Sequence, residues 1–303
     1  MKYTRLVLAL LVIASCGTPT PEVEPEYRSA IEQWRTQRLE RLTADDGWLT
    51  VVGLHWLADG VNRVGGNRGM EIALAAPDVP PLAATLEVTD AGTVIARAAT
   101  EGVVTINGQP LTEATLKTDS EGQPDMLQIG RLTMFVIDRG GRLAVRVKDP
   151  ESDARAQFGG IESFPIDPSF RVVATLQPYD SPREVSIPTV TGTPTTMLAP
   201  GLLHFQLGGE ELTLEPYVGS PDDDSYFVIF RDRTSGDTTY GGGRFLSVDS
   251  VGEDGTTEID FNYAYSPPCA FTAFATCPLP TPQNSLPVAI TAGEKHGGAG
   301  HHE

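Results

Sequence analysis

From residue 48 onward the chain is a succession of short apolar stretches separated by turn residues, and this pattern restricts the fold more than any other feature. Glycine and proline are frequent, at 31 and 24 residues, while 40% of all residues are hydrophobic. Short apolar stretches between Gly, Pro, Asn and Asp are typical of β-strands joined by turns. The sequence therefore predicts a mostly β fold with a proper core.

The first half, residues 47–150, is expected to form a small β unit of sandwich type. The dipeptide Asn107-Gly108 favours a hairpin because both residues tolerate positive φ. In WLTVVGLHWL, apolar residues occupy both alternating faces, which predicts a strand buried on both sides. The expected strands cover residues 48–57, 70–74, 84–88, 94–98, 103–106, 127–138 and 142–148.

The second half, residues 151–295, predicts a second antiparallel sandwich or barrel packed on the first. A polar, glycine-containing stretch at residues 149–160 connects the two. The last part, residues 260–294, is expected to wrap back over the second sheet, because its prolines favour an extended path. The expected strands cover residues 171–176, 184–190, 202–207, 212–217, 225–231, 244–248 and 257–261.

One helix precedes the β region. Within residues 27–46, Tyr27, Ile31, Trp34 and Leu42 fall near one stripe with charged residues between them. This spacing predicts an amphipathic helix that packs on the body as a clasp.

The N-terminal residues 1–15 have the features of a bacterial lipoprotein signal peptide: Lys2 and Arg5 precede a short apolar run that ends at Cys16. Acylation at Cys16 would anchor the chain in a membrane. An ordinary cleaved signal peptide is the alternative. Because Gly17 follows Cys16, we expect a cell-envelope location at the outer membrane, facing the periplasm. Residues 16–26 would form a tether and residues 296–303 a flexible tail.

The net formal charge is −18. Nucleic acid is therefore not an expected partner, since phosphate binding requires basic patches. The charge favours a small-molecule cation or a basic protein as the guest, although acidic surfaces also simply confer solubility.

Two of the three cysteines, Cys269 and Cys277, enclose seven residues. In an exported protein they are expected to form a disulfide, or else to be buried structural thiols. A nucleophilic or metal-binding thiol is the alternative, and His55 and His204 are the only histidines within the body to support it. No zinc-type ligand spacing and no cofactor motif occurs, so neither a metal nor a cofactor is expected.

Two polar groups are candidate ligand-binding elements. The first is Tyr240 to Arg244 (YGGGR), in which the glycines around Gly242 would let backbone N–H groups approach a ligand while Arg244 clamps an anion. A bulged strand is the structural alternative.

The second group consists of Asp260, Asn262, Asn284 and Glu294. Asp260 and Asn262 would share one face of a strand. Asp260 and Glu294, or His55 as a base, are the candidate catalytic residues of a hydrolase. Ordinary surface carboxylates and a core histidine are the alternatives.

Three segments together resemble one family: GWLTVVGLHWLADGVNRVGG, FRDRTSGDTTYGGGRFL and DFNYAYSPPCAFTAFATCPLPTPQNSLPVAITAGEK. They are similar to the bacterial and archaeal domain of unknown function 1684 family, over residues 34–295. The resemblance implies no established activity. Two functions are therefore carried forward: a lipid-anchored module of the cell envelope that binds a small molecule or serves as an accessory protein, and a hydrolase with a carboxylate and arginine pocket.

Overall fold

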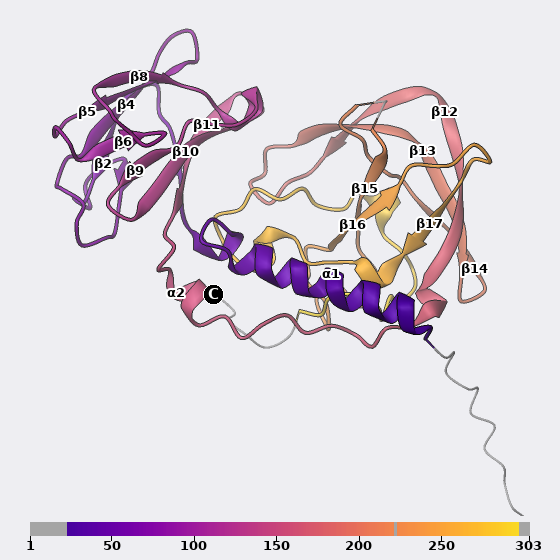
Figure 1. Ribbon diagram of the computed structural model, residues 1–303. Coiled ribbons are helices and arrows are strands. Elements are labelled where there is room, and N and C mark those ends of the chain that lie inside the picture. The colour runs from indigo at the N-terminus through magenta and orange to yellow at the C-terminus, as the bar shows by residue number, and fades with distance from the viewer. Residues whose placement is uncertain (1–22, 221–222, 297–303) are drawn as a thin grey trace, which may run out of the picture.

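The computed structural model describes residues 23–220 and 223–296. Two β units lie side by side, and a long N-terminal helix runs beneath the second unit toward the junction (Figure 1). The predicted fold class, mostly β with several antiparallel sheets and an N-terminal helix, is confirmed. The signal peptide, Cys16 and residues 297–303 of the tail lie outside the described residues.

The first unit is a sandwich of a six-stranded sheet, in the order β1-β11-β10-β9-β6-β7, and a five-stranded sheet, in the order β3-β2-β4-β5-β8. Its core lies between the sheets, where alternate residues such as Leu86, Met134 and Val145 are buried together. The elements are η1 (Trp48–Thr50), β1 (Val51–Trp56), β2 (Gly60–Gly65), β3 (Ile72–Ala73), β4 (Ala84–Val88), β5 (Val94–Ala98), β6 (Val104–Ile106), β7 (Gln109–Pro110), β8 (Glu113–Leu116), η2 (Asp119–Glu121), β9 (Leu127–Ile129), β10 (Leu132–Arg139) and β11 (Arg142–Lys148).

The hairpin at Asn107 forms as its local sequence predicts. Asn107 and Gly108 have φ values of 49° and 80° and join β6 to β7. The strand expected in WLTVVGLHWL differs from the prediction. It begins only at Val51, because residues Trp48–Thr50 form a turn of 3₁₀-helix. It is also an edge strand with Val52 exposed, so the prediction that it is buried on both faces is wrong.

The second unit packs a four-stranded sheet, in the order β14-β13-β12-β17, against the two-stranded sheet β15-β16. None of the sheets in the described residues closes into a barrel. The strands expected at residues 171–176 and 184–190 are one long strand with an irregular register between Pro178 and Arg183. The elements are α2 (Asp153–Ala156), η3 (Pro168–Phe170), β12 (Arg171–Ile187), β13 (Thr195–Leu207), β14 (Glu210–Leu214), β15 (Ser225–Phe230), β16 (Arg244–Asp249), β17 (Thr256–Asp260), η4 (Phe261–Tyr263), η5 (Pro268–Ala270) and η6 (Pro282–Asn284).

Helix α1 (Pro25–Thr43) buries Ile31 and Leu42 and is held at specific contacts on the second unit. The Tyr27 hydroxyl donates to Asp260 at 2.7 Å, and the Trp34 ring meets the Tyr263 ring edge-on at 5.3 Å between centroids. No helix in the described part of the chain is long and apolar enough to cross a membrane.

Candidate functional site

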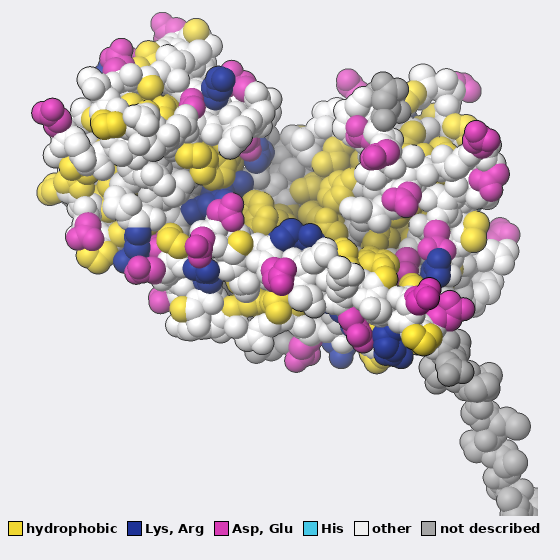
Figure 2. Space-filling view, viewed as in Figure 1, with side chains coloured by type: hydrophobic (Ala, Val, Ile, Leu, Met, Phe, Trp, Pro, Cys, Tyr) yellow, Lys and Arg dark blue, Asp and Glu magenta, His cyan; other side chains and the backbone are white. Residues whose placement is uncertain are grey.

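A cavity of about 390 Å³ lies between the two β units. The space-filling view shows the molecule hollowed at this position, with basic side chains and apolar side chains gathered on its walls (Figure 2). Volumes of this size are typical of small-molecule sites, which often form between domains. Both units contribute walls, so the cavity depends on how they pack together.

Arg146 reaches the cavity from the outer face of the six-stranded sheet. In β11, Val145 and Val147 point into the sandwich core, and the alternation of a strand places Arg146 on the opposite face. There it lies in register between Phe135 of β10 and Leu54 of β1. The sheet thus holds a guanidinium group against the second unit.

The Arg146 side chain is buried without an anionic partner. The residue is 5% exposed, and within residues 23–220 and 223–296 it forms no ion pair. In the same described ranges, its side chain has one hydrogen bond, a long 3.5 Å contact to the Thr276 hydroxyl, and its Nε has no partner. Burial, with a smaller contribution from Arg139, lowers the pKa of Arg146 to about 10. An unpaired buried cation is costly, which makes this position a candidate for binding an anion.

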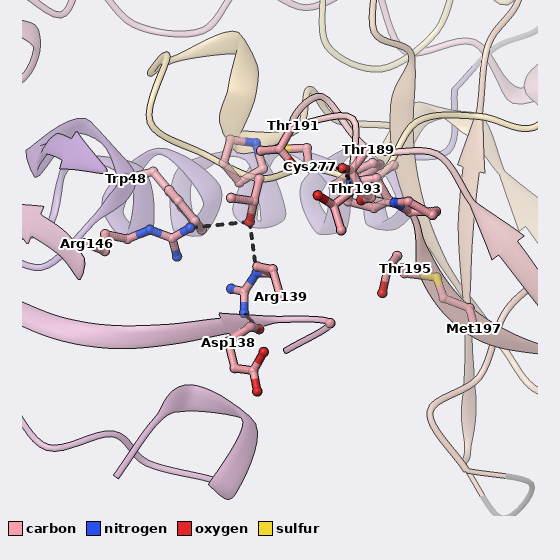
Figure 3. Close-up of a pocket in the computed structure, with 16 residues that line it drawn as sticks. Trp48, Asp138, Arg139, Arg146, Thr189, Thr191, Thr193, Thr195, Met197 and Cys277 are labelled. Carbon is pink, nitrogen blue, oxygen red and sulfur yellow. Dashed lines mark hydrogen bonds between the residues drawn. The ribbon is translucent and has the colours of Figure 1, made fainter. Parts of the chain in front are cut away.

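Arg139 and Thr276 complete the polar end of the cavity (Figure 3). The Arg139 Nε donates to the Thr276 hydroxyl at 3.0 Å, and its NH2 group forms an ion pair with Asp119 at 2.8 Å. Asp138 also lines the cavity, but its Oδ1 accepts the backbone N–H of Gly141, and its carboxylate points away from Arg146. Two guanidinium groups therefore meet at one hydroxyl.

The opposite wall combines threonine hydroxyls with apolar side chains. Thr189, Thr191 and Thr193 come from the loop between β12 and β13, and the Thr193 hydroxyl accepts a hydrogen bond from Arg142 of the first unit at 2.8 Å. Trp48 and Phe245 supply aromatic surface. The Arg146 guanidinium carbon lies 4.9 Å from the centre of the Trp48 ring. This cation–π contact partly offsets the free-energy cost of burying the Arg146 charge.

Cys277 lines the cavity, Cys269 lies next to it, and the structure has both as free thiols. The backbone N–H of each faces the sulfur of the other, at 3.2 Å and 3.4 Å. A hydrogen bond from the Cys277 thiol lowers the pKa of Cys269, while the same interaction and burial raise that of Cys277. The predicted disulfide stays a prediction.

The candidate residues Asp260 and Asn262 lie under helix α1. Asp260 accepts hydrogen bonds from Tyr27 and from the backbone N–H of Asn262, and Asn262 exchanges hydrogen bonds with the backbone of Asp167. Both are buried, and neither lines the cavity between the units. Their polar atoms hold the helix and the chain entry to β12 in place.

Arg244 and Glu294 belong to a second buried network. Arg244 is fully buried, pairs with Asp232 at 2.8 Å and donates to the carbonyls of Ile290 and Ala292. Glu294 accepts from Arg38 at 3.0 Å and from the backbone N–H of Ser266. Burial raises the pKa of Glu294. The network attaches the last segment of the chain to the second unit. The two terminal nitrogens of Arg244 donate to these protein partners, while its Nε has no partner among the described residues.

The other three ligand-binding candidates, Asn284, Tyr240 and Gly242, also have identifiable contacts. Asn284 is fully buried and makes hydrogen bonds to the backbone of Glu215, directly after β14, and of Ile229 in β15, which joins the C-terminal segment to this part of the unit. Tyr240 is half-buried against His296, and burial raises its pKa to about 12. A Cβ at Gly242 would lie 2.5 Å from the ring of Tyr240. The glycines form a turn ahead of β16, closed by a hydrogen bond from the Gly243 N–H to the Tyr240 carbonyl at 3.0 Å, and not the bulged strand of the structural alternative.

His55 lines a different cavity, of about 440 Å³, together with Asp149 and Arg131. It is half-buried, and burial lowers its pKa. Among the described residues, no cluster of three or more His, Cys, Asp or Glu side chains is arranged to hold a metal ion.

The sequence interpretation missed the residues that do converge on the cleft, chiefly Arg146, Arg139 and Trp48. One feature of the sequence pointed to Arg146: in LAVRVK it is a single arginine between apolar residues of a strand, and arginine is rarely buried unless it is paired. The function of Arg146 depends on the side chains opposite it. One of these is Thr276, which lies more than a hundred residues further along the chain.

Comparisons with known proteins add a family but no reaction. The family model described as "Protein of unknown function (DUF1684)" matches residues 156–295. A solution NMR structure of an uncharacterized protein of Haloarcula marismortui is 35% identical, with 46% of this chain and 78% of that chain covered and a TM-score of 0.40. A crystal structure of the FhaA FHA domain bound to an intracellular domain is 15% identical, with 31% and 97% covered and a TM-score of 0.22. No curated protein matches.

Proposed function

Because this chain belongs to the DUF1684 family, whose members have no assigned function, we propose from the cleft itself that the protein is a small-molecule-binding module for an organic anion. The observation that carries the proposal is Arg146, a buried guanidinium group with no anionic partner in the described residues. A bound carboxylate or phosphate ester would supply the missing charge and hydrogen-bond acceptors. Arg139 and Thr276 would contribute further hydrogen bonds to the bound anion.

The proposed ligand is negatively charged, whereas the protein's net charge of −18 favours a positively charged ligand. A net charge describes the long-range field of the molecule, whereas a ligand in the cleft meets the few charges on its walls. Here the unpaired charge is positive, and Asp119 is already paired with Arg139. An anion is therefore the guest that this cavity favours.

The same proposal places the module in the cell envelope, anchored through lipid at Cys16 and facing the periplasm. Its support is the order of charge, apolar run and cysteine in the first 16 residues. A hydrolase would need its carboxylates in a cavity beside the substrate. Since Asp260 and Glu294 are held by Tyr27 and Arg38 in structural contacts, we propose binding as the function.

Calorimetric titration of the full chain with a panel of small anions tests the proposal. The panel comprises hexanoate, benzoate, a phosphate monoester and inorganic phosphate, with hexylammonium as the charge control. We expect at least one organic anion to bind, and Arg146→Met to weaken its binding at least tenfold. Arg63→Gln, at an exposed arginine paired with Glu71, should leave binding unchanged. Equal binding to the wild-type protein and Arg146→Met would contradict the proposal.

A further inference from the structure

A second cavity, of about 400 Å³, adjoins the first. The two share Trp48, Phe245 and Pro268 as wall residues, so they are neighbouring parts of one groove. A third space, of about 380 Å³, continues from the first at Met197 and from the second at Phe227. The groove is therefore longer than a compact ligand at Arg146 would need.

The walls of the second cavity are mainly aromatic. Phe227 and Phe245 meet edge-on at 4.9 Å between centroids, and Trp34 and Tyr265 lie 6.2 Å apart. Among the residues that the structure describes, no carboxylate lines this part of the groove. Of its two arginines, Arg38 is paired with Glu294, so its charge is already compensated. Arg41 is exposed and forms no ion pair within the described residues, so solvent can hydrate its charge. Figure 2 shows the corresponding apolar surface inside the hollow.

The groove thus has a buried, unpaired cation, Arg146, at one end and a mainly aromatic surface beside the exposed Arg41 at the other. We propose that its ligand is a single-chain anionic amphiphile, with the head group on Arg146 and Arg139 and an acyl chain along Trp48, Phe245 and Phe227. This inference rests on the proposed function and names its ligand class. A charged head supplies the interaction that Arg146 lacks, while burial of the chain supplies apolar contact area.

The test is a chain-length series measured by calorimetry below micellar concentrations. The protein is the full chain carrying Cys16→Ser, which cannot be acylated at that residue, so no detergent needs to compete for the groove. The probes are hexanoate, octanoate, decanoate and dodecanoate, with dodecyl phosphate as a second anionic head and dodecyltrimethylammonium as the cationic control. We expect Kd to fall by up to about fourfold for each methylene buried, and the cationic control not to bind.

Ser247→Trp tests the position of the chain. Ser247 is exposed at the wall of the second cavity, so a large side chain there should fill the groove without disturbing the core. We expect this variant to bind hexanoate like the unmodified protein and to lose the gain from longer chains. Ser186→Trp, at an exposed position of β12 that lines none of the three cavities, is the matched control and should keep the gain.

The outcomes separate the two proposals. Anion binding that requires Arg146 but does not depend on chain length would overturn the amphiphile and leave the proposed function intact. Retention of the chain-length gain in Ser247→Trp would also overturn it. If neither the short nor the long anions bind to the unmodified protein, the proposed function fails together with the inference.

Discussion

At the scale of single residues, two arginines show how differently a buried charge can be used. Arg244 and Arg146 are both buried, at 0% and 5% exposure. Arg244 is paired with Asp232 and with backbone carbonyls, so its charge is compensated within the protein. Arg146 has aromatic rings and one long hydrogen bond around it. Arg244 is thus part of a structural ion pair, and we interpret Arg146 as a residue whose anionic partner is a ligand.

Replacing each arginine by methionine should separate these roles. Arg244→Met leaves Asp232 buried and unpaired, so we expect the free energy of unfolding to fall by about 3–5 kcal/mol. Arg146→Met removes an uncompensated charge while keeping most of the side-chain volume, so the free energy of unfolding should be unchanged or rise by about 1 kcal/mol. Denaturant unfolding of both variants measures the difference. A loss at Arg146 as large as that at Arg244 would mean that its charge has a structural partner.

At the scale of elements, the segment between Cys269 and Cys277 connects the thiols to the cleft. Thr276, which meets both cleft arginines, is the residue directly before Cys277. Thr272 in the same segment donates to the carbonyl of Val51 in the first unit. A restraint on this short loop would therefore also restrain one wall of the proposed site.

Oxidation should link Cys269 to Cys277 with little rearrangement, because the two residues are already in mutual contact. In the chain-entropy account, closing this loop stabilises the protein by about 2–3 kcal/mol. Counting thiols in native and unfolded protein, before and after reduction, measures the pairing, and Cys277→Ser is the control. Two thiols that stay free under a mild oxidant would contradict the predicted disulfide.

At the scale of the whole molecule, local patterns predicted the elements better than they predicted the site. The helix stripe, the hairpin at Asn107 and strands such as Ala84–Val88 depend on neighbours in sequence. Whether a strand lies at a sheet edge, as β1 does, depends on distant pairing. The polar candidates Asp260, Asn284 and Glu294 were conspicuous in the sequence, but the fold uses them to attach α1 and the C-terminal segment.

The cleft could not be predicted because it requires both units together. Arg146 comes from the first unit, and Thr276 and Phe245 come from the second. No sequence spacing indicates that these residues meet. The same reasoning explains why an acidic molecule has a cationic cavity: the composition sums all charges, whereas the fold determines which of them remain unpaired beside a cavity.

The most direct measurement is a crystal structure of the protein with a fatty carboxylate that carries bromine at the end of its chain. Anomalous scattering locates the bromine, and the electron density locates the carboxylate. We predict that the carboxylate oxygens lie within hydrogen-bond distance of Arg146 and that the bromine lies among Phe227, Phe245 and Tyr265. A carboxylate bound away from Arg146, or an empty cleft at saturating ligand, would contradict the account.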